Sequence, residues 1–166
     1  DRTSLVGGNV SSKLAQACSD NELCHSFMTF NTCYKDTGLF GVYGVCDKYS
    51  VQDFVWYTME CLVRLVHKTT DEEVERAKTQ LKASMLLMQD GSSAVCEEIG
   101  RQMLTYGRRM SPAEIFARID AVDAATVRAT ADAVINDQDH ALAALGPIAE
   151  LPDYNFVRRR SYWLRH

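Results

Sequence analysis

Residues 23–47 read LCHSFMTFNTCYKDTGLFGVYGVCD, and this stretch decides the fold. Aromatic and β-branched side chains recur on both sides of a short polar segment, Lys35-Asp36-Thr37-Gly38. Such side chains suit a half-buried pleated surface, whereas Asp, Thr and Gly favour tight turns. The stretch therefore predicts two long strands joined by a turn, with Gly38 at a positive φ. Most of the remaining chain is expected to be helical, so this hairpin is the sheet that the helices cover.

Helix start signals follow the hairpin along the chain. Thr70 and Glu73 have the spacing of a capping box, and Ser111-Pro112 combines a capping hydroxyl with proline at the first helical position. Asn9 and Ser50 are further capping candidates. The predicted helices cover residues 9–19, 50–67, 70–89, 93–106, 111–120 and 123–136.

Apolar residues spaced by three and four predict the buried face of each helix. On the helix from 50 this face is Val51, Val55, Met59, Leu62 and Val66. On the helix from 70 it is Val74, Ala77, Leu81, Met85 and Met88. On the helix from 93 it is Val95, Ile99, Met103 and Tyr106.

The small apolar segment 140–145 is predicted to return as a third strand. Strands that come first and helices that cluster later indicate an α+β fold, in which a partial antiparallel sheet is backed by several helices. We expect residues 1–150 to form an incomplete domain. Residues 151–166 form a basic, aromatic tail that is expected to serve as a docking segment.

Composition narrows the class of protein. The net charge of −4 disfavours a general nucleic-acid binder, and no apolar run is long enough to span a membrane. The six cysteines include no C-x-x-C pair, so we expect free thiols in a reducing compartment, and neither a disulfide framework nor a zinc site. The chain starts at Asp1 without a visible targeting segment, and we expect it to be a fragment, a processed piece or half of a split protein.

Several blocks of the sequence resemble one family, the pitrilysin-type zinc metallopeptidases. The similarity is to members that act as the β subunit of the mitochondrial processing peptidase or as the core 1 subunit of complex III, with plant and green-algal forms the most similar. The blocks that carry the resemblance are NVSSKLAQ (9–16), LCHSFMTF (23–30), NTCYKDTGLFGVY (31–43), 76–89, 90–109, ARIDAVD (117–123) and ALGPIAELPD (144–153).

The resemblance implies that this chain is the later part of the second of two related α+β domains. It also implies partners: an α processing peptidase or core 2 subunit, other subunits of complex III, and presequence peptides. The expected location is the matrix side of the mitochondrial inner membrane, with no transmembrane span of its own.

The catalytic signature of the family is missing. The family binds zinc through His-x-x-Glu-His and a distant Glu in its first domain, where the metal and a Glu activate water. The four histidines here are His25, His67, His140 and His166, and none of them begins His-x-x-Glu. We therefore expect no metal, no catalytic residue and no activity in this chain alone.

The resemblance nevertheless points to residues that face substrate or partners. Some members hold substrate with a Tyr whose position falls on His25, so His25 and the nearby Asn31 are substrate-facing candidates, although a hydrogen-bonded strand histidine is the simpler interpretation. The basic, aromatic tail offers interface candidates, since Arg and aromatic residues are enriched at interface cores. They are Arg158, Arg159, Arg160, Tyr162 and Trp163.

Two function classes remain open. In one, the chain is part of a processing peptidase that doubles as a complex III core subunit. In the other, it is a purely structural core 1 subunit without proteolysis. An intact His-x-x-Glu-His in a first domain would favour the former, and a degenerate one the latter.

Overall fold

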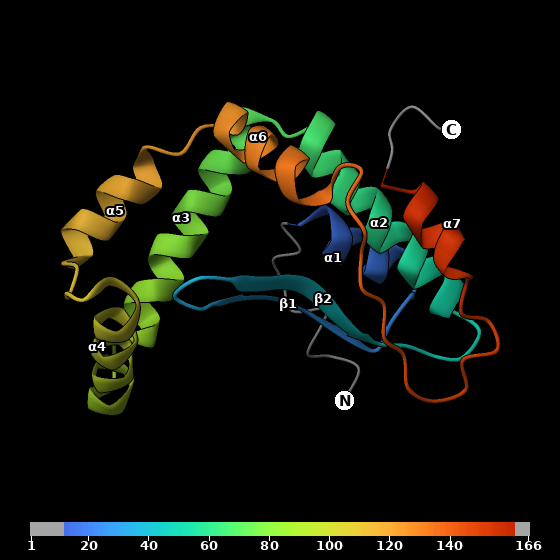
Figure 1. The fold of residues 1–166 in the computed structure, drawn as a ribbon, viewed down its shortest axis with the longest axis horizontal. Helices are drawn as coiled ribbons and strands as arrows, with labels where there is room; N and C mark the ends of the chain where they lie inside the picture. The colour runs from blue at the N-terminus through green and yellow to red at the C-terminus, as the bar shows by residue number, and fades with distance from the viewer. Residues whose placement is uncertain (1–11, 162–166) are drawn as a thin grey trace. The chain divides into compact units, whose positions relative to one another are not determined.

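The computed structural model describes residues 12–161 and has the predicted α+β fold (Figure 1). One two-stranded sheet is followed mainly by helices. The elements in chain order are α1 (Lys13–Asp20), β1 (Ser26–Cys33), β2 (Gly38–Val45), α2 (Val51–His67), α3 (Asp71–Met88), α4 (Ser92–Tyr106), α5 (Pro112–Asp120), α6 (Ala124–Ile135) and α7 (Tyr154–Arg159).

The hairpin forms where the sequence predicts it. The amide of His25 donates to the carbonyl of Val45 over 2.8 Å at the open end, and the amide of Tyr34 donates to the carbonyl of Thr37 over 2.9 Å at the turn. The prediction of a positive φ at Gly38 is wrong. Gly38 instead permits a close approach, because a Cβ there would lie 3.1 Å from the carbonyl oxygen of Thr32.

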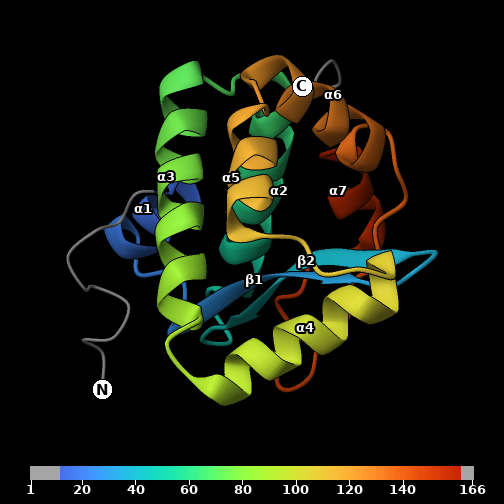
Figure 2. The ribbon, with the colours of Figure 1, turned by 90° about the vertical axis from the view of Figure 1, so that its left-hand side faces the viewer.

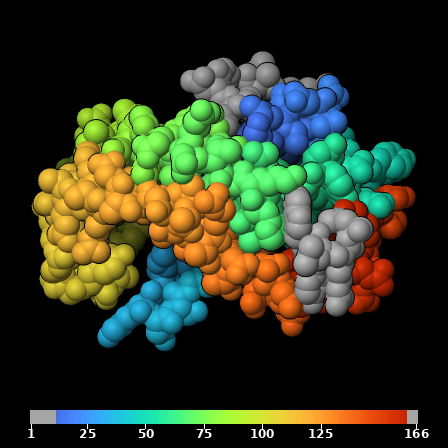
Figure 3. All heavy atoms as spheres, turned by 90° about the horizontal axis from the view of Figure 1, so that it is seen from above, coloured from blue at the N-terminus to red at the C-terminus, as the bar shows by residue number. Residues whose placement is uncertain are grey.

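The described residues divide into two compact units, and the first comprises residues 12–31, 40–68 and 129–161. Its main core consists of Leu14 and Cys18 from α1, Leu23, and Phe54 from α2. Helix α1 packs against α2, as the blue and blue-green atoms show in Figure 3. The ring of Phe54 lies directly over Gly44 of β2, where a Cβ would be only 2.3 Å from Cζ. This contact seats α2 on the hairpin.

A second cluster in the same unit joins the far end of α2 to α6 through Val66, Ala131 and Ile135. Helix α7, which lies within the predicted tail and was not expected, packs on α2. Val157 is only 3% exposed and Ser161 is completely buried. The predicted boundary at residue 150 stays a prediction, but the first part of the tail is folded.

The second unit comprises residues 32–39 and 69–128, and in it α3 and α5 lie side by side (Figure 2). Lys78 donates to the carbonyl of Asp120 over 3.2 Å, and Lys82 donates to its carboxylate over 2.5 Å. Cations therefore neutralise the negative C-terminal end of α5. The capping box of Thr70 and Glu73 is confirmed with both of its hydrogen bonds.

The buried faces predicted for α3 and α4 are largely wrong. Of the α3 stripe only Val74 is buried, while Leu81 is 49% and Met88 74% exposed. On α4, Met103 and Tyr106 are exposed and the buried residue is Gln102. Periodicity predicts which residues share a face, but burial needs a neighbouring element, and the described residues supply none over these positions.

The strand predicted at 140–145 is also wrong, because no residue there lies in a strand. A strand needs a partner backbone, and within residues 12–161 the sheet contains only β1 and β2. Leu145 is fully exposed. On α2 the buried residues include Phe54 and Val63, which the predicted stripe omitted. The proposed Asn9 cap lies outside the described residues, and Ser12 caps α1 instead.

The contact between Phe54 and Gly44 predicts a sharp cost for a single methyl group. Gly44→Ala should lower the free energy of unfolding by about 1–3 kcal/mol, the usual penalty for overpacking a filled core. Urea denaturation measures it. Gly100→Ala is the matched control, because nothing lies within 4 Å of a Cβ added at that position of α4. It should stabilise by about 0.5–1 kcal/mol. Equal effects of the two substitutions would contradict the packing described.

Candidate functional site

His25 lies at the open end of the hairpin and forms an exposed pair with Asp47. The Nε2 atom of His25 is 3.1 Å from Oδ1 of Asp47, and the two side chains are 52% and 71% exposed. His25 precedes β1 and Asp47 follows β2, so the hairpin register brings them together. The Asp47 carboxylate contacts Nε2 of the ring, and Nδ1 is not part of this contact.

Asn31 is exposed on β1, six residues beyond His25. At about 3.3 Å per residue the two positions are roughly 20 Å apart along the strand. The structure therefore does not bring these two predicted substrate-facing residues into one site. Each stays a separate prediction.

Arg158 is held inside the first unit by four hydrogen bonds. Its Nε donates to the carboxylate of Asp139 over 2.6 Å, and Nη2 donates to the carboxylate and carbonyl of Asp137 over 2.7 and 3.1 Å. Its Nη1 donates to the hydroxyl of Ser161 over 2.7 Å. The guanidinium ties α7 to the loop after α6, so its present role is intramolecular.

The neighbouring arginines differ from Arg158. The guanidinium of Arg160 lies 5.2 Å from the ring centroid of Trp56 and 5.1 Å from that of Phe156, a cation–π arrangement that joins α7 to α2. Arg159 is exposed. Tyr162 and Trp163 lie outside the described residues.

His140 adjoins the Arg158 network. Its Nε2 is buried without a hydrogen-bond partner among the described residues. Burial, followed by the positive charge of Arg158, lowers the pKa of His140, and the charge of Asp139 opposes this. The folded chain therefore favours the neutral imidazole.

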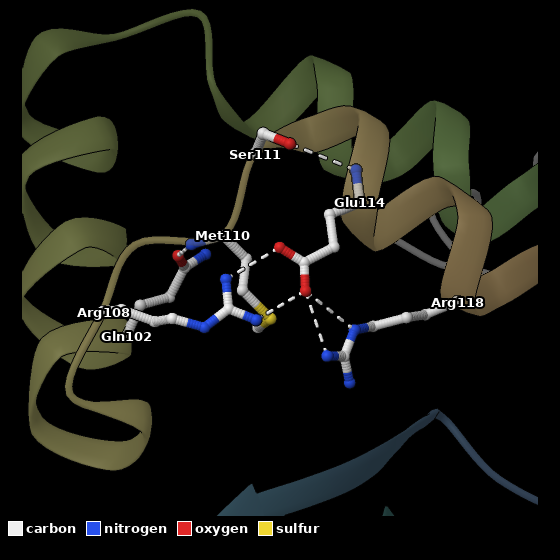
Figure 4. Close-up of polar contacts among 6 residues, drawn as sticks. All are labelled: Gln102, Arg108, Met110, Ser111, Glu114 and Arg118. Carbon is white, nitrogen blue, oxygen red and sulfur yellow. Dashed lines mark hydrogen bonds and ion pairs between the residues drawn. The ribbon is translucent and has the colours of Figure 1, made fainter.

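The corner between α4 and α5 holds polar contacts that the sequence did not reveal (Figure 4). Glu114 accepts two hydrogen bonds from Arg108, at 2.6 and 2.8 Å, and two more from Arg118. These bonds, with that of Arg108 the largest effect, lower the pKa of the Glu114 carboxyl to about 2. The buried Gln102 accepts a hydrogen bond from the amide of Met110. Through Glu114, the corner ties the loop after α4 to α5.

None of the described histidines, cysteines and carboxylates form a group of three or more that fits a metal ion. Across the same residues, every helix is too short or too polar to cross a membrane.

Comparisons with known proteins add an independent line of argument. Residues 3–81 match the model of the peptidase M16 inactive domain. The chain is 52% identical to the probable mitochondrial-processing peptidase subunit beta of Arabidopsis thaliana. The alignment spans 163 residues and covers 97% of this chain and 31% of that protein. It is 45% identical to cytochrome b-c1 complex subunit 1 of Bos taurus, over 96% of this chain and 33% of that protein.

A solved structure of a complex III chain has a similar fold. A chain of complex III2 from Candida albicans, bound to Inz-5, superposes with a TM-score of 0.86 at 28% identity, over 94% of this chain and 39% of that chain.

The lowered pKa of His140 leads to a prediction of how the stability of the chain depends on pH. Because the pKa of His140 is lower in the folded chain than the ordinary value of about 6.5, the unfolded chain binds the extra proton first. The free energy of unfolding should therefore fall as the pH drops below about 6.5. Urea titrations of the wild type and His140→Gln at several pH values between about 5 and 8 measure this. Identical slopes for the two proteins would disprove it.

The chain spans about a third of the length of the curated relatives it matches. Within that third, the α+β fold, the match to the inactive-domain model and the identity along nearly the whole chain agree with one another. Residues 3–81 thus match the inactive domain of the peptidase M16 family, and nearly the whole chain is similar to about a third of the processing peptidase and cytochrome b-c1 subunits named above.

Proposed function

We propose that this chain is the C-terminal part of a mitochondrial processing peptidase β subunit that also serves as a core subunit of complex III. The observation that carries the proposal is the 52% identity to a processing peptidase β subunit along 97% of the chain. In this role the chain supplies chamber wall and assembly surface. Presequence cleavage then requires zinc in another domain of the full-length protein, because the described residues gather no metal ligands.

The proposed partners are those that the family resemblance implies. They are an α processing peptidase or core 2 subunit, the other subunits of complex III, and presequence peptides. We place the protein on the matrix side of the inner membrane, as a peripheral part of that complex. The similarity to a cytochrome b-c1 subunit and to a complex III chain supports the assembly role.

A purely structural core 1 subunit is the second candidate. The 45% identity to cytochrome b-c1 complex subunit 1 favours it. The two candidates differ in whether the full-length protein cleaves presequences.

The decisive experiment uses the full-length protein with its partner subunits. A fluorogenic presequence peptide should be cleaved, and a zinc chelator should abolish the cleavage. Incorporation into complex III is measured in parallel on native gels. Incorporation without any cleavage would establish the structural candidate, and cleavage without incorporation would remove the core-subunit role.

His25 tests the substrate-facing prediction within that assembly. If the imidazole contacts presequences, His25→Ala should raise KM about tenfold, which corresponds to about 1.4 kcal/mol, the scale of one hydrogen bond. Asp47→Asn should have a smaller effect in the same direction, because it removes the carboxylate that orients the ring. His67→Ala, an exposed histidine at the end of α2, is the matched control. Unchanged kinetics for His25→Ala would end the proposal.

The tail arginines test the docking segment. Arg159→Glu should reduce incorporation into the complex without a change in the stability of the chain, because this side chain is exposed. Arg158→Ala should lower stability itself, since it removes the bonds to Asp137 and Asp139. Native gels and urea denaturation separate the two effects. Normal incorporation of Arg159→Glu would exclude this arginine from the docking surface.

A further inference from the structure

Four of the cysteines gather in the core of the first unit. Cys18 is buried among Leu14, Leu23 and Phe54, and three half-buried thiols pack against this cluster. Those three are Cys24, Cys46 and Cys61. The other two cysteines, Cys33 and Cys96, are exposed and lie outside it. The proposed function uses none of these thiols.

The end of α1 brings two of the four thiols together. Helix α1 ends at Asp20, and Glu22 adopts a left-handed backbone with φ of 49°. The amide of Leu23 then donates back to the carbonyl of Cys18 over 3.1 Å. This is the backbone pattern of a Schellman C-cap, in which the chain reverses immediately after the helix. The reversal brings the chain back at Cys24, which packs against the same apolar cluster that contains Cys18.

We propose that Cys18 and Cys24 are a dithiol site that a peroxide converts to a disulfide, which ties the end of α1 to the start of β1. The Cys24 sulfur attacks one peroxide oxygen, the O–O bond breaks, and the Cys24 proton leaves with the departing oxygen as water. This gives a sulfenic acid on Cys24. The Cys18 sulfur then attacks that sulfur, the S–O bond breaks, and the Cys18 proton leaves with the hydroxyl as a second water. Two thiols are oxidised, and one peroxide is reduced to two waters.

The environment assigns the order of the two steps. Cys24 is the less buried of the two and is the one an oxidant reaches first. Burial raises the pKa of both thiols, that of Cys18 to about 12, whereas the neighbouring Cys18 thiol acts to lower the pKa of Cys24. The thiolate therefore forms more readily on Cys24, and Cys18 resolves the sulfenic acid. Because both thiols stay largely protonated at neutral pH, the reaction is slow and responds to sustained oxidation.

Cys46 and Cys61 are the competing partners. Cys46 follows β2 and Cys61 lies on α2, and both pack against the same apolar cluster. Cys18 and Cys24 are the pair that the reversal at Glu22 joins, through the hydrogen bond that the Leu23 amide donates to the Cys18 carbonyl. Peptide mapping separates all of these pairings.

The test needs no substitution in its first form. The full chain is treated with hydrogen peroxide, remaining thiols are blocked with N-ethylmaleimide, and the protein is digested with trypsin, Glu-C and chymotrypsin. Cleavage after Lys13, Glu22 and Phe27 releases fragments 14–22 and 23–27, each with one cysteine. A linked pair of these two fragments, which separates on reduction, is the expected result. Links to Cys33, Cys46 or Cys61 instead, or only unlinked and over-oxidised fragments, would overturn the proposal.

Variants then test the roles of the two thiols. Cys18→Ser should leave Cys24 as a sulfenic acid that a dimedone probe labels, whereas Cys24→Ser should suppress both the label and the disulfide. Cys61→Ser, in the same cluster, is the matched control and should form the disulfide at the wild-type rate. Far-UV circular dichroism verifies that each variant is folded. Dimedone labelling of Cys24→Ser at Cys18 would reverse the assigned order and contradict the proposal.

Discussion

The first unit depends on the contact between Phe54 of α2 and Gly44 of β2. The ring occupies the space that a Cβ at position 44 would fill, so α2 lies directly on the hairpin. The same phenylalanine completes the cluster with Leu14 and Cys18 of α1. One aromatic side chain thus fixes a strand and two helices relative to one another. This packing also positions the open end of the hairpin, where His25 and Asp47 lie. It likewise positions the end of α1, where Cys18 and Cys24 lie.

Features with a local physical cause could be predicted from the sequence. The capping box of Thr70 and the Ser111-Pro112 start are satisfied by residues within one helical turn, and both form as predicted. The strand predicted at 140–145 failed because a strand also needs a partner backbone. The stripes on α3 and α4 failed for a similar reason, since periodicity cannot say what covers a face. The buried residue of α4 is instead Gln102, which accepts a hydrogen bond from the amide of Met110, eight residues along the chain.

The residues of the candidate site also differ in whether the sequence could predict their contacts. His25 was reached only through a family resemblance, but its partner Asp47 was accessible from the sequence, because counting outward from the 35–38 turn places the two at the same end of the hairpin. The bonds from Arg158 to Asp137 and Asp139 had no such signal. They cross a loop of irregular backbone whose path no periodicity predicts. The thiol pair depends on the left-handed backbone at Glu22, which is uncommon for this residue type.

The three consecutive arginines at the end of α7, the last of which is its C-cap residue Arg160, serve different ends. Successive residues point about 100° apart around a helix, so three neighbours face three directions. Arg158 turns to the acidic loop, Arg160 stacks on Trp56 and Phe156, and Arg159 remains exposed. Two positive charges therefore hold the helix on its own chain. Only an arginine that does not make such intramolecular contacts is available to a partner. A docking role for this segment therefore depends on the exposed Arg159 and not on the number of arginines.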